Sequence, residues 1–318
     1  MKETARGLVL KIHNRLIAGF IIAFSFILIV FWKIDYVYEV ALFNHLAQTT
    51  PSRDRNLSAL EVEESLFNLT THQISRMLHT KDEKSPLVFL LTGFALCDQQ
   101  AKVLTRFLYF RNIKARAVPL FFDSGISNHT IFEWLNEGQW VISDPFLHFP
   151  INIPASDFLD LDTHLSKSEE QKNLIQRAHA YYQEMGLLKE LKETYDRPNH
   201  STWEYFRKKP ETQLIESAIS APLRLWPRPY LKLLNDSYRL RFSHQNPLLN
   251  QYLKARHQEL MGECRQALNG YESLLERVEE EKSETDHQFN LSQSMIKWRI
   301  DANLMNCEAD LASNAAQH

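Results

Sequence analysis

The chain has 318 residues, of which 44% are hydrophobic and 24% are charged, and these proportions are typical of a globular protein. Its 36 Lys and Arg residues and 39 Asp and Glu residues leave a formal net charge of -3, so no basic excess points to a nucleic-acid partner. With only 8 glycines and 12 prolines, the sequence is neither of low complexity nor an array of short strands. The length allows one or two domains with an appendage.

An apolar segment near the N-terminus, residues 16–32, contains no charged side chain. It is just long enough to cross a bilayer, and a buried core helix of this length is rarely apolar on every side. Several basic residues precede it, whereas Lys33 is the only one between it and Arg53. The positive-inside rule then leaves the N-terminus in the cytoplasm and the rest outside it. No convincing cleavage site follows, so we expect a single-pass, uncleaved anchor in the inner membrane.

After the apolar segment, the spacing of hydrophobic residues is first typical of helices and then of strands. Residues 34–84 are predicted to be helical, with a capping-box pattern at Ser58 and Glu61, and a further helix is predicted over 97–112. Short runs rich in β-branched and aromatic residues follow and predict strands. These runs are 115–122, 129–135 and 140–143, the last two separated by a turn at 136–139. A helix beside a small antiparallel sheet predicts an α+β fold.

From about residue 165 the sequence is almost wholly helical in pattern. A Pro-rich joint at 221–229 interrupts it, and its Arg224, Trp226 and Arg228 either touch lipid headgroups or simply belong to the joint. Residues 249–280 resemble a single tetratricopeptide hairpin without a second clear copy, which is a weak match. We expect a helical module that packs against the α+β core.

Cys97 stands where an apolar run, Phe94 to Leu96, meets the start of a polar helix. A thiol in the first turn of a helix feels the positive end of the helix dipole, which favours the nucleophilic thiolate. The alternative from this stretch alone is a small buried hydrophobe, since free cysteines are commonly buried.

His129 and Asp144 lie on the two sides of the predicted hairpin. If Glu137 and Gly138 form a two-residue turn, Asp144 faces Ile131 and lies diagonally beside His129 on one face of the sheet. A loop one residue longer, without a bulge, would put the two side chains on opposite faces. The sequence permits a carboxylate beside the imidazole but does not compel it.

Residues 93–145 resemble the core of the transglutaminase-like superfamily of papain-type thiol enzymes. The matching pieces are CDQQA at 97–101, NIKARAVPL at 112–120, HTIFEW at 129–134 and GQWVISDP at 138–145. The resemblance implies that Cys97 is the nucleophile, His129 the general acid and base, and Asp144 the carboxylate that orients the imidazole. It also implies a papain-like α+β core with the Cys-bearing helix packed on the sheet.

The resemblance suggests three regions and a function. Residues 1–33 form the tail and anchor, 34–160 the thiol-enzyme domain, and 161–318 the helical region. We expect a membrane-anchored peptidase, amidase or acyl transferase that acts outside the cytoplasm on a protein or peptide-like amide or ester through a Cys97 thioester. The backbone N–H of Cys97 is the expected oxyanion donor, and the sequence identifies no second donor. No cofactor, resident metal or nucleic acid is expected.

Two other functions remain open at this stage. The first is a scaffold. In it the thiol-enzyme core is catalytically inert, and the helical C-terminal half binds a partner in an envelope assembly. Ala95, where many family members have glycine, leaves room for this interpretation. The second is a metal enzyme built on the acidic cluster of Asp157, Asp160, Asp162 and His164, whose spacing fits no standard calcium loop.

A few further residues bear alternative interpretations. Cys264 and Cys307 form a disulfide outside the cytoplasm or remain buried thiols. Glu133 lines the cleft or is an exposed strand carboxylate, and Arg116 pairs with a carboxylate or is solvated. Trp134 and Trp140 are expected to be packing residues.

Overall fold

The structure is a computed structural model that describes residues 33–50, 57–76, 85–121, 127–161, 168–197, 210–243, 246–281 and 294–302. The expected anchor, residues 16–32, and its tail lie outside these ranges. None of the helices within the ranges combines the length and the apolarity that crossing a bilayer requires.

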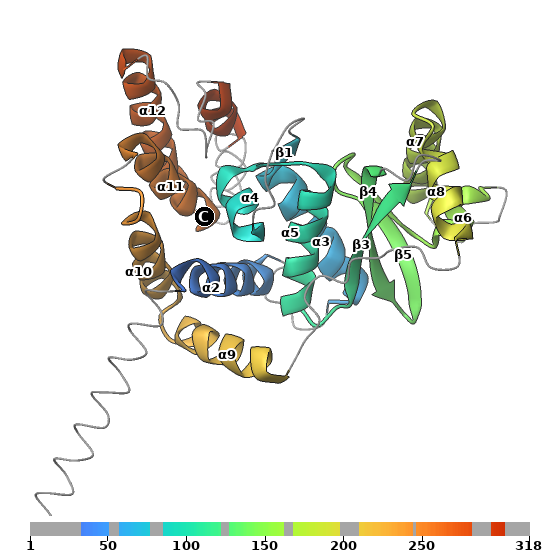
Figure 1. The fold of residues 1–318 in the computed structure, drawn as a ribbon, viewed down its shortest axis with the longest axis horizontal. Helices are drawn as coiled ribbons and strands as arrows, with labels where there is room; N and C mark the ends of the chain where they lie inside the picture. The colour runs from blue at the N-terminus through green and yellow to red at the C-terminus, as the bar shows by residue number, and fades with distance from the viewer. Residues whose placement is uncertain are drawn as a thin grey trace, which may run out of the picture.

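Helix α5 (Cys97–Phe110) lies at the centre of the molecule (Figure 1). Three earlier helices pack against it, namely α2 (Ile34–Thr49), α3 (Ala59–Gln73) and α4 (Pro86–Thr92). Leu104, Phe107 and Leu108 of α5 are fully buried, and the ring of Phe107 lies 4.6 Å from that of Phe43 in α2. The helix that begins at Cys97 is therefore held on several sides by apolar packing.

A four-stranded antiparallel sheet packs on α5. The predicted α+β class is therefore confirmed. Its strands lie in chain order: β3 (Ala115–Phe121), β4 (Ser127–Asn136), β5 (Gln139–Asp144) and β6 (Phe149–Ile153). Ala117, Phe132 and Trp134 belong to the core shared with α5. The residues that alternate with them, such as Val118 and Ile131, join a second core on the other face.

Helices α7 (Glu169–Glu184) and α8 (Leu187–Asp196) cover that second face of the sheet (Figure 1). A short helix, α6 (Ala155–Leu159), lies between β6 and α7 in the chain. Ile175, Tyr182 and Leu191 are buried among the strand residues. The sheet is thus a layer between α5 on one side and α7 and α8 on the other.

The predicted helix over 34–84 proves to be two helices. The capping box is confirmed, because the Ser58 N–H donates to Glu61 Oε2 at 2.8 Å and the Glu61 N–H donates to Ser58 Oγ at 3.3 Å. The prediction was wrong about the end of this segment. Ile74 is extended, and β1 (Ser75–Arg76) pairs in parallel with β2 (Phe94–Ala95) directly before Cys97.

The later elements within the described residues are all helical. They are α9 (Pro210–Ser220), the 3-10 turn η1 (Ala221–Arg224), α10 (Pro227–Arg239), α11 (Pro247–Leu260), α12 (Cys264–Glu281) and a helical segment at 294–302. α9 and α10 pack against α2, and the rings of Tyr38 and Tyr238 lie 5.5 Å apart. α11 and α12 form a close hairpin in which a Cβ on Gly270 would lie 2.9 Å from that of Ala255.

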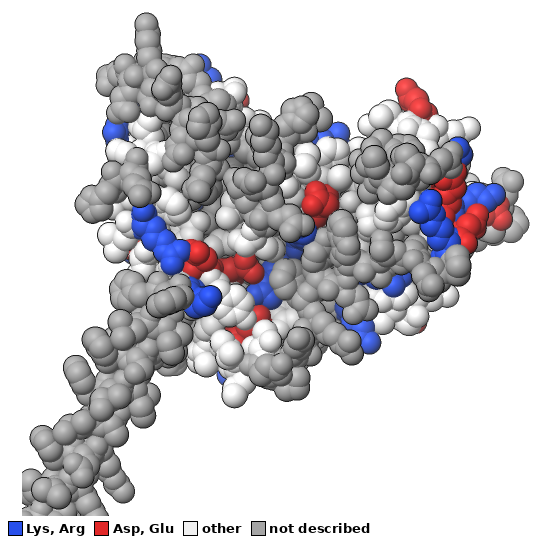
Figure 2. Space-filling view, in the orientation of Figure 1, with Lys and Arg blue, Asp and Glu red and all other residues white. Residues whose placement is uncertain are grey.

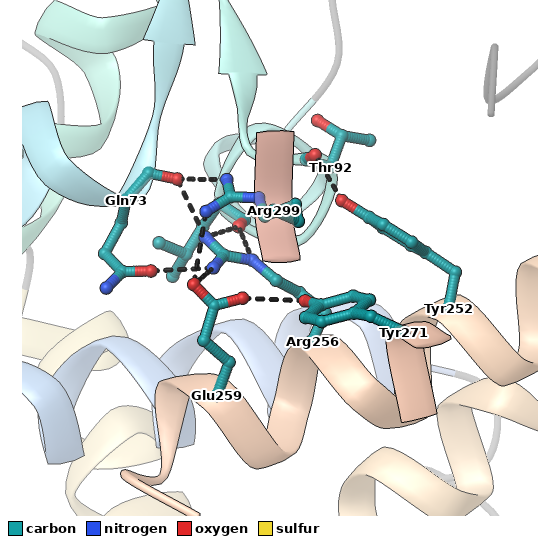
Figure 3. Close-up of polar contacts among 8 residues, drawn as sticks. Gln73, Thr92, Tyr252, Arg256, Glu259, Tyr271 and Arg299 are labelled. Carbon is teal, nitrogen blue, oxygen red and sulfur yellow. Dashed lines mark hydrogen bonds and ion pairs between the residues drawn. The ribbon is translucent and has the colours of Figure 1, made fainter. Parts of the chain in front are cut away.

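A buried polar cluster joins these helices to the segments on either side of β1 and β2 (Figure 3). Arg256 and Arg299 each pair with Glu259, at 2.7 and 3.2 Å, and both donate to the carbonyl of Gln73. Arg256 also donates to the carbonyl of Leu90. These carbonyls belong to the end of α3 and to α4, which lead into β1 and β2, so the C-terminal helices help to fix the paired strands beside Cys97.

Candidate active site

Cys97 is the first residue of α5, as its sequence context predicts. Its side chain is half-buried. The first i to i-4 bond of the helix runs from the Gln100 N–H to the Leu96 carbonyl at 2.9 Å, so the N–H groups of the first turn have no acceptor within the helix. The thiol therefore lies at the positive end of the helix dipole, beside N–H groups that are not bonded along the helix.

The two glutamines that follow Cys97 bind back to the segment before it. The Leu96 N–H donates to Gln99 Oε1 at 2.9 Å, and Gln100 Nε2 donates to the Ala95 carbonyl at 3.4 Å. Both side chains are buried. Their contacts hold the turn from β2 into α5, and so they help to fix where the Cys97 side chain lies.

The hairpin has the register that places His129 and Asp144 on one face. Asn136 pairs with Gln139 across the two-residue turn, and the pairing runs on to Phe132 and Ser143. Glu137 and Gly138 have φ of 48° and 87°, the left-handed values that a tight hairpin turn of this kind needs. The turn predicted at 136–139 is confirmed, and of the two loop lengths that the sequence left open, the two-residue one is present.

His129 and Asp144 form a buried pair. Nε2 of His129 lies 2.6 Å from Oδ2 of Asp144, and the two side chains are 7% and 0% exposed. The carboxylate also accepts a hydrogen bond from the Tyr182 hydroxyl at 2.5 Å and one from the Leu147 N–H at 3.0 Å. Three donors satisfy the buried carboxylate and hold it in one orientation.

The charges of this pair support one another. Burial disfavours a charged imidazole, but the Asp144 carboxylate, its hydrogen bond and the nearby Cys97 side chain outweigh burial and raise the pKa of His129 to about 10. Burial likewise disfavours the ionised carboxyl, yet His129, Tyr182 and the Leu147 N–H together lower the pKa of Asp144. At neutral pH the pair is thus an imidazolium and a carboxylate.

The same imidazole lies close to the thiol, since Cys97 is among the groups that raise the pKa of His129. The structure therefore brings all three predicted site residues together, in the order thiol, imidazole, carboxylate. α5 supplies the first, β4 the second and the end of β5 the third.

Tyr182 is a part of the site that the sequence did not indicate. It lies on α7, 38 residues after Asp144, and its burial beside that carboxylate raises its pKa well above the ordinary value, which keeps the hydroxyl a donor. The residue comes from the predicted helical region, 161–318. No spacing or motif connects it to Asp144, because the contact depends on how α7 packs on the sheet.

Other side chains border the imidazole. The ring of Phe146 lies 5.9 Å from that of His129, and the Arg76 guanidinium lies 5.3 Å from the Phe146 centroid. On the side of α8, Glu190 is buried, and burial raises its pKa while the nearby His129 charge opposes this. The site is therefore flanked by an exposed cation, an aromatic ring and a second carboxyl group.

Glu133 and Arg116 have structural partners. Glu133 is buried, so the interpretation of it as an exposed carboxylate is wrong. Arg116 Nε lies 2.6 Å from one Glu133 oxygen, and the Tyr195 hydroxyl donates to the other. The Arg116 guanidinium also stacks 4.0 Å from the Trp140 ring. These contacts tie β3, β4 and α8 together beside the site.

The remaining candidates are not brought together by the described residues. Asp162 and His164 of the acidic cluster lie outside the described ranges, and within those ranges no group of three His, Cys, Asp or Glu side chains is arranged to hold a metal ion. Cys264 opens α12, whereas Cys307 also lies outside the ranges.

Comparison of the chain with protein-family models, with curated proteins and with solved structures found no match in any of the three. The geometry of the site is therefore the basis for assigning a function.

Proposed function

We propose that this protein is a thiol enzyme whose nucleophile is Cys97, with His129 as general acid and base and Asp144 as the orienting carboxylate. The observation that carries the proposal is the buried His129–Asp144 pair, which lies close to a half-buried cysteine at a helix start. Such an arrangement supplies the thiolate, the proton shuttle and the orienting group that thiol catalysis needs.

The chemistry follows from the protonation states. The Cys97 thiolate attacks an amide or ester carbonyl, and the oxygen takes the negative charge next to the N–H groups at the start of α5. The His129 imidazolium then gives its proton to the leaving amine or alcohol, and a thioester remains on Cys97. Water or an amine transfers a proton to the imidazole, attacks the thioester and releases the thiolate.

We favour hydrolysis over transfer, because water needs no dedicated acceptor site. A helix that begins at Cys97, His129 on the second strand after it and the Asp-Pro pair at 144–145 resemble the transglutaminase-like superfamily. We propose this finer fold for residues 34–160. We further propose that residues 16–32 anchor the enzyme in the inner membrane, with the site outside the cytoplasm and a protein or peptide-like substrate.

The test is the rate at which iodoacetamide alkylates the full-length protein as the pH is varied. Wild-type Cys97 should react faster at neutral pH than a cysteine in an unstructured peptide, because His129 and the helix start favour the thiolate. The Cys97→Ser variant should lose the fast reaction. In His129→Ala the reaction should move to higher pH, since the positive partner is lost.

His179→Ala is the matched control, because His179 lies on α7 and packs its ring against Phe158 at 5.6 Å. It should keep the wild-type alkylation profile. If wild-type Cys97 reacts no faster than the peptide and His129→Ala changes nothing, the enzyme proposal fails and an inert scaffold takes its place.

A further inference from the structure

Large apolar side chains are exposed mainly on three consecutive elements, α9, η1 and α10 with their connections. Among the described residues seven such side chains are exposed, and Met185, beside α7, is the one that lies elsewhere. The other six are Leu214, Ile215, Leu225, Trp226, Leu233 and Leu240, and we call them the α9–α10 surface. Leu214, Leu225 and Trp226 are 75%, 73% and 67% exposed.

Part of this surface is a regular stripe along α10. Trp226, Leu233 and Leu240 follow one another at seven-residue intervals, so they lie two turns apart on one side of the helix. Leu231 and Leu234 occupy a different side, where they are buried in the core shared with α2. α10 thus has one apolar side for the protein core and another that meets solvent.

Positive charge accompanies the stripe. Residues 221–243 contain five Lys or Arg residues and one Asp, although the whole chain has a formal net charge of -3. Arg224, Arg228 and Lys232 are exposed close to Trp226 in the chain. Lys and Arg side chains lie over α10 in the space-filling view (Figure 2). Exposed Leu and Trp flanked by Lys and Arg are typical of helices that lie in a membrane interface.

The surface adjoins the point where the expected anchor ends. The anchor is predicted to end at residue 32, and α2 begins at Ile34. Asp35, in the first turn of α2, pairs with Arg241 at 2.7 Å, next to Leu240. Tyr36 donates to Glu216 at 3.3 Å, next to Ile215. Two sides of the surface therefore reach the residues that would emerge first from the bilayer.

We infer that the α9–α10 surface lies on the lipid bilayer, with Trp226 at the headgroup level and the flanking basic side chains near lipid phosphates. The occupant is lipid because the anchor leaves no linker between the bilayer and α2, on which α9 and α10 pack. The inference rests on the predicted anchor and is independent of the chemistry proposed for Cys97.

The test uses the full-length chain with Cys97, Cys264 and Cys307 replaced by Ser, reconstituted into protein-free vesicles of phosphatidylcholine and phosphatidylglycerol. An environment-sensitive fluorophore is attached through Trp226→Cys or, separately, Leu233→Cys. Met185→Cys is the matched control, because Met185 is also an exposed apolar residue but lies beside α7, at the other end of the molecule from α10 (Figure 1). Ser25→Cys reports on the anchor itself.

Lipids that carry a nitroxide near the headgroup should quench the fluorophore at 226 and at 233 and leave the one at 185 bright. Lipids that carry the nitroxide deep in the acyl chain should quench the label at Ser25, which lies near the middle of the predicted span. Labels at 226 and 233 that stay bright while the Ser25 label is quenched would overturn the inference. If their emission then depends on protein density in the vesicles, a second copy covers the surface instead. An unquenched Ser25 label would show that the anchor is wrong, and the inference would fall with it, while the alkylation test of Cys97 would stand.

Discussion

Asp144 shows how much a single buried carboxylate depends on its donors. It is fully buried and accepts bonds from His129, Tyr182 and the Leu147 N–H. A buried charge without partners is very costly, so the strands and α7 must deliver all three donors before the carboxylate can remain ionised. As a result, the fold sets both the charge and the orientation of the His129 imidazole.

The raised pKa of His129 predicts a pH-dependent stability. Because the folded value of about 10 lies above the ordinary 6.5, the stabilisation that His129 gives is complete below pH 6.5 and is lost as the pH rises toward 10. The lowered pKa of Asp144 acts at the other end, since its contribution is present above the ordinary value of 3.8 and is lost as the pH falls. The His129–Asp144 pair therefore stabilises the fold most between about pH 3.8 and pH 6.5.

Urea unfolding of the full-length protein in detergent micelles measures this effect. The difference in unfolding free energy between wild type and His129→Ala should shrink as the pH is raised from 6.5 to 10. His179→Ala should keep the wild-type dependence, because burial lowers the pKa of His179 and the group does not titrate in this window. A difference that stays constant or grows with pH would contradict the assigned charge state of His129.

At the scale of elements, Gly93 joins the C-terminal helices to the segment that leads into α5. Its φ is +74°, and a Cβ there would lie 1.5 Å from Nη2 of Arg299. Gly186 has the same φ of +74°, but within the described part of the structure no atom lies within 4 Å of its Cβ position. The two glycines therefore separate backbone strain from the loss of a contact.

Gly186→Ala should lower the unfolding free energy by about 1–2 kcal/mol, the cost of a left-handed backbone at a residue with a Cβ. Gly93→Ala should cost about 3–5 kcal/mol, because it also displaces a buried guanidinium from Glu259. Urea unfolding of both variants provides the comparison. In an Arg299→Ala background, Gly93→Ala should cost no more than Gly186→Ala, and equal costs in the wild-type background would refute the role of Arg299.

Local signals explain which elements the sequence could predict. The start of α5 at Cys97 and the hairpin turn at 137–138 depend on residues adjacent in the chain, and both predictions are confirmed. Neither α4 nor β6 was predicted. Each is short, and the register of β6 against β5 shifts between Ile142 and Asp144. Weak local preference is overridden there by packing.

Long-range contacts explain what the sequence could not supply. Glu133 was expected to line the cleft or to be exposed, and it is buried instead, where the Tyr195 hydroxyl of α8 donates to it. In the same way, Tyr182 reaches Asp144 only because α7 crosses the sheet. The predicted boundary at residue 160 lies between Asp144 and Tyr182, so the site draws on both sides of it. Pairs of this kind carry no signal in a single sequence.

At the scale of the whole molecule, the charges around the expected anchor predict the topology. Basic residues before residue 16 should keep the N-terminus in the cytoplasm and leave residues 34–318 outside it. A reporter that is active only in the periplasm, fused after His318 in a Gram-negative host, should be active. The same fusion without residues 16–32 should be silent. An inactive full-length fusion, expressed at a normal level, would contradict the localisation.

The length of α5 has a consequence for what the thiol can reach. Tyr109, near the end of this helix, binds Glu216 of α9, while Cys97 opens the other end, and α5 extends away from α9 (Figure 1). The rise of an α-helix over these residues is about 18 Å. If α9 rests on lipid and α5 stands upright above it, α5 holds the sulfur at about this height above the bilayer surface. Acyl chains and headgroups then lie out of range, and the bonds within reach belong to polypeptides that extend from the membrane or diffuse past it.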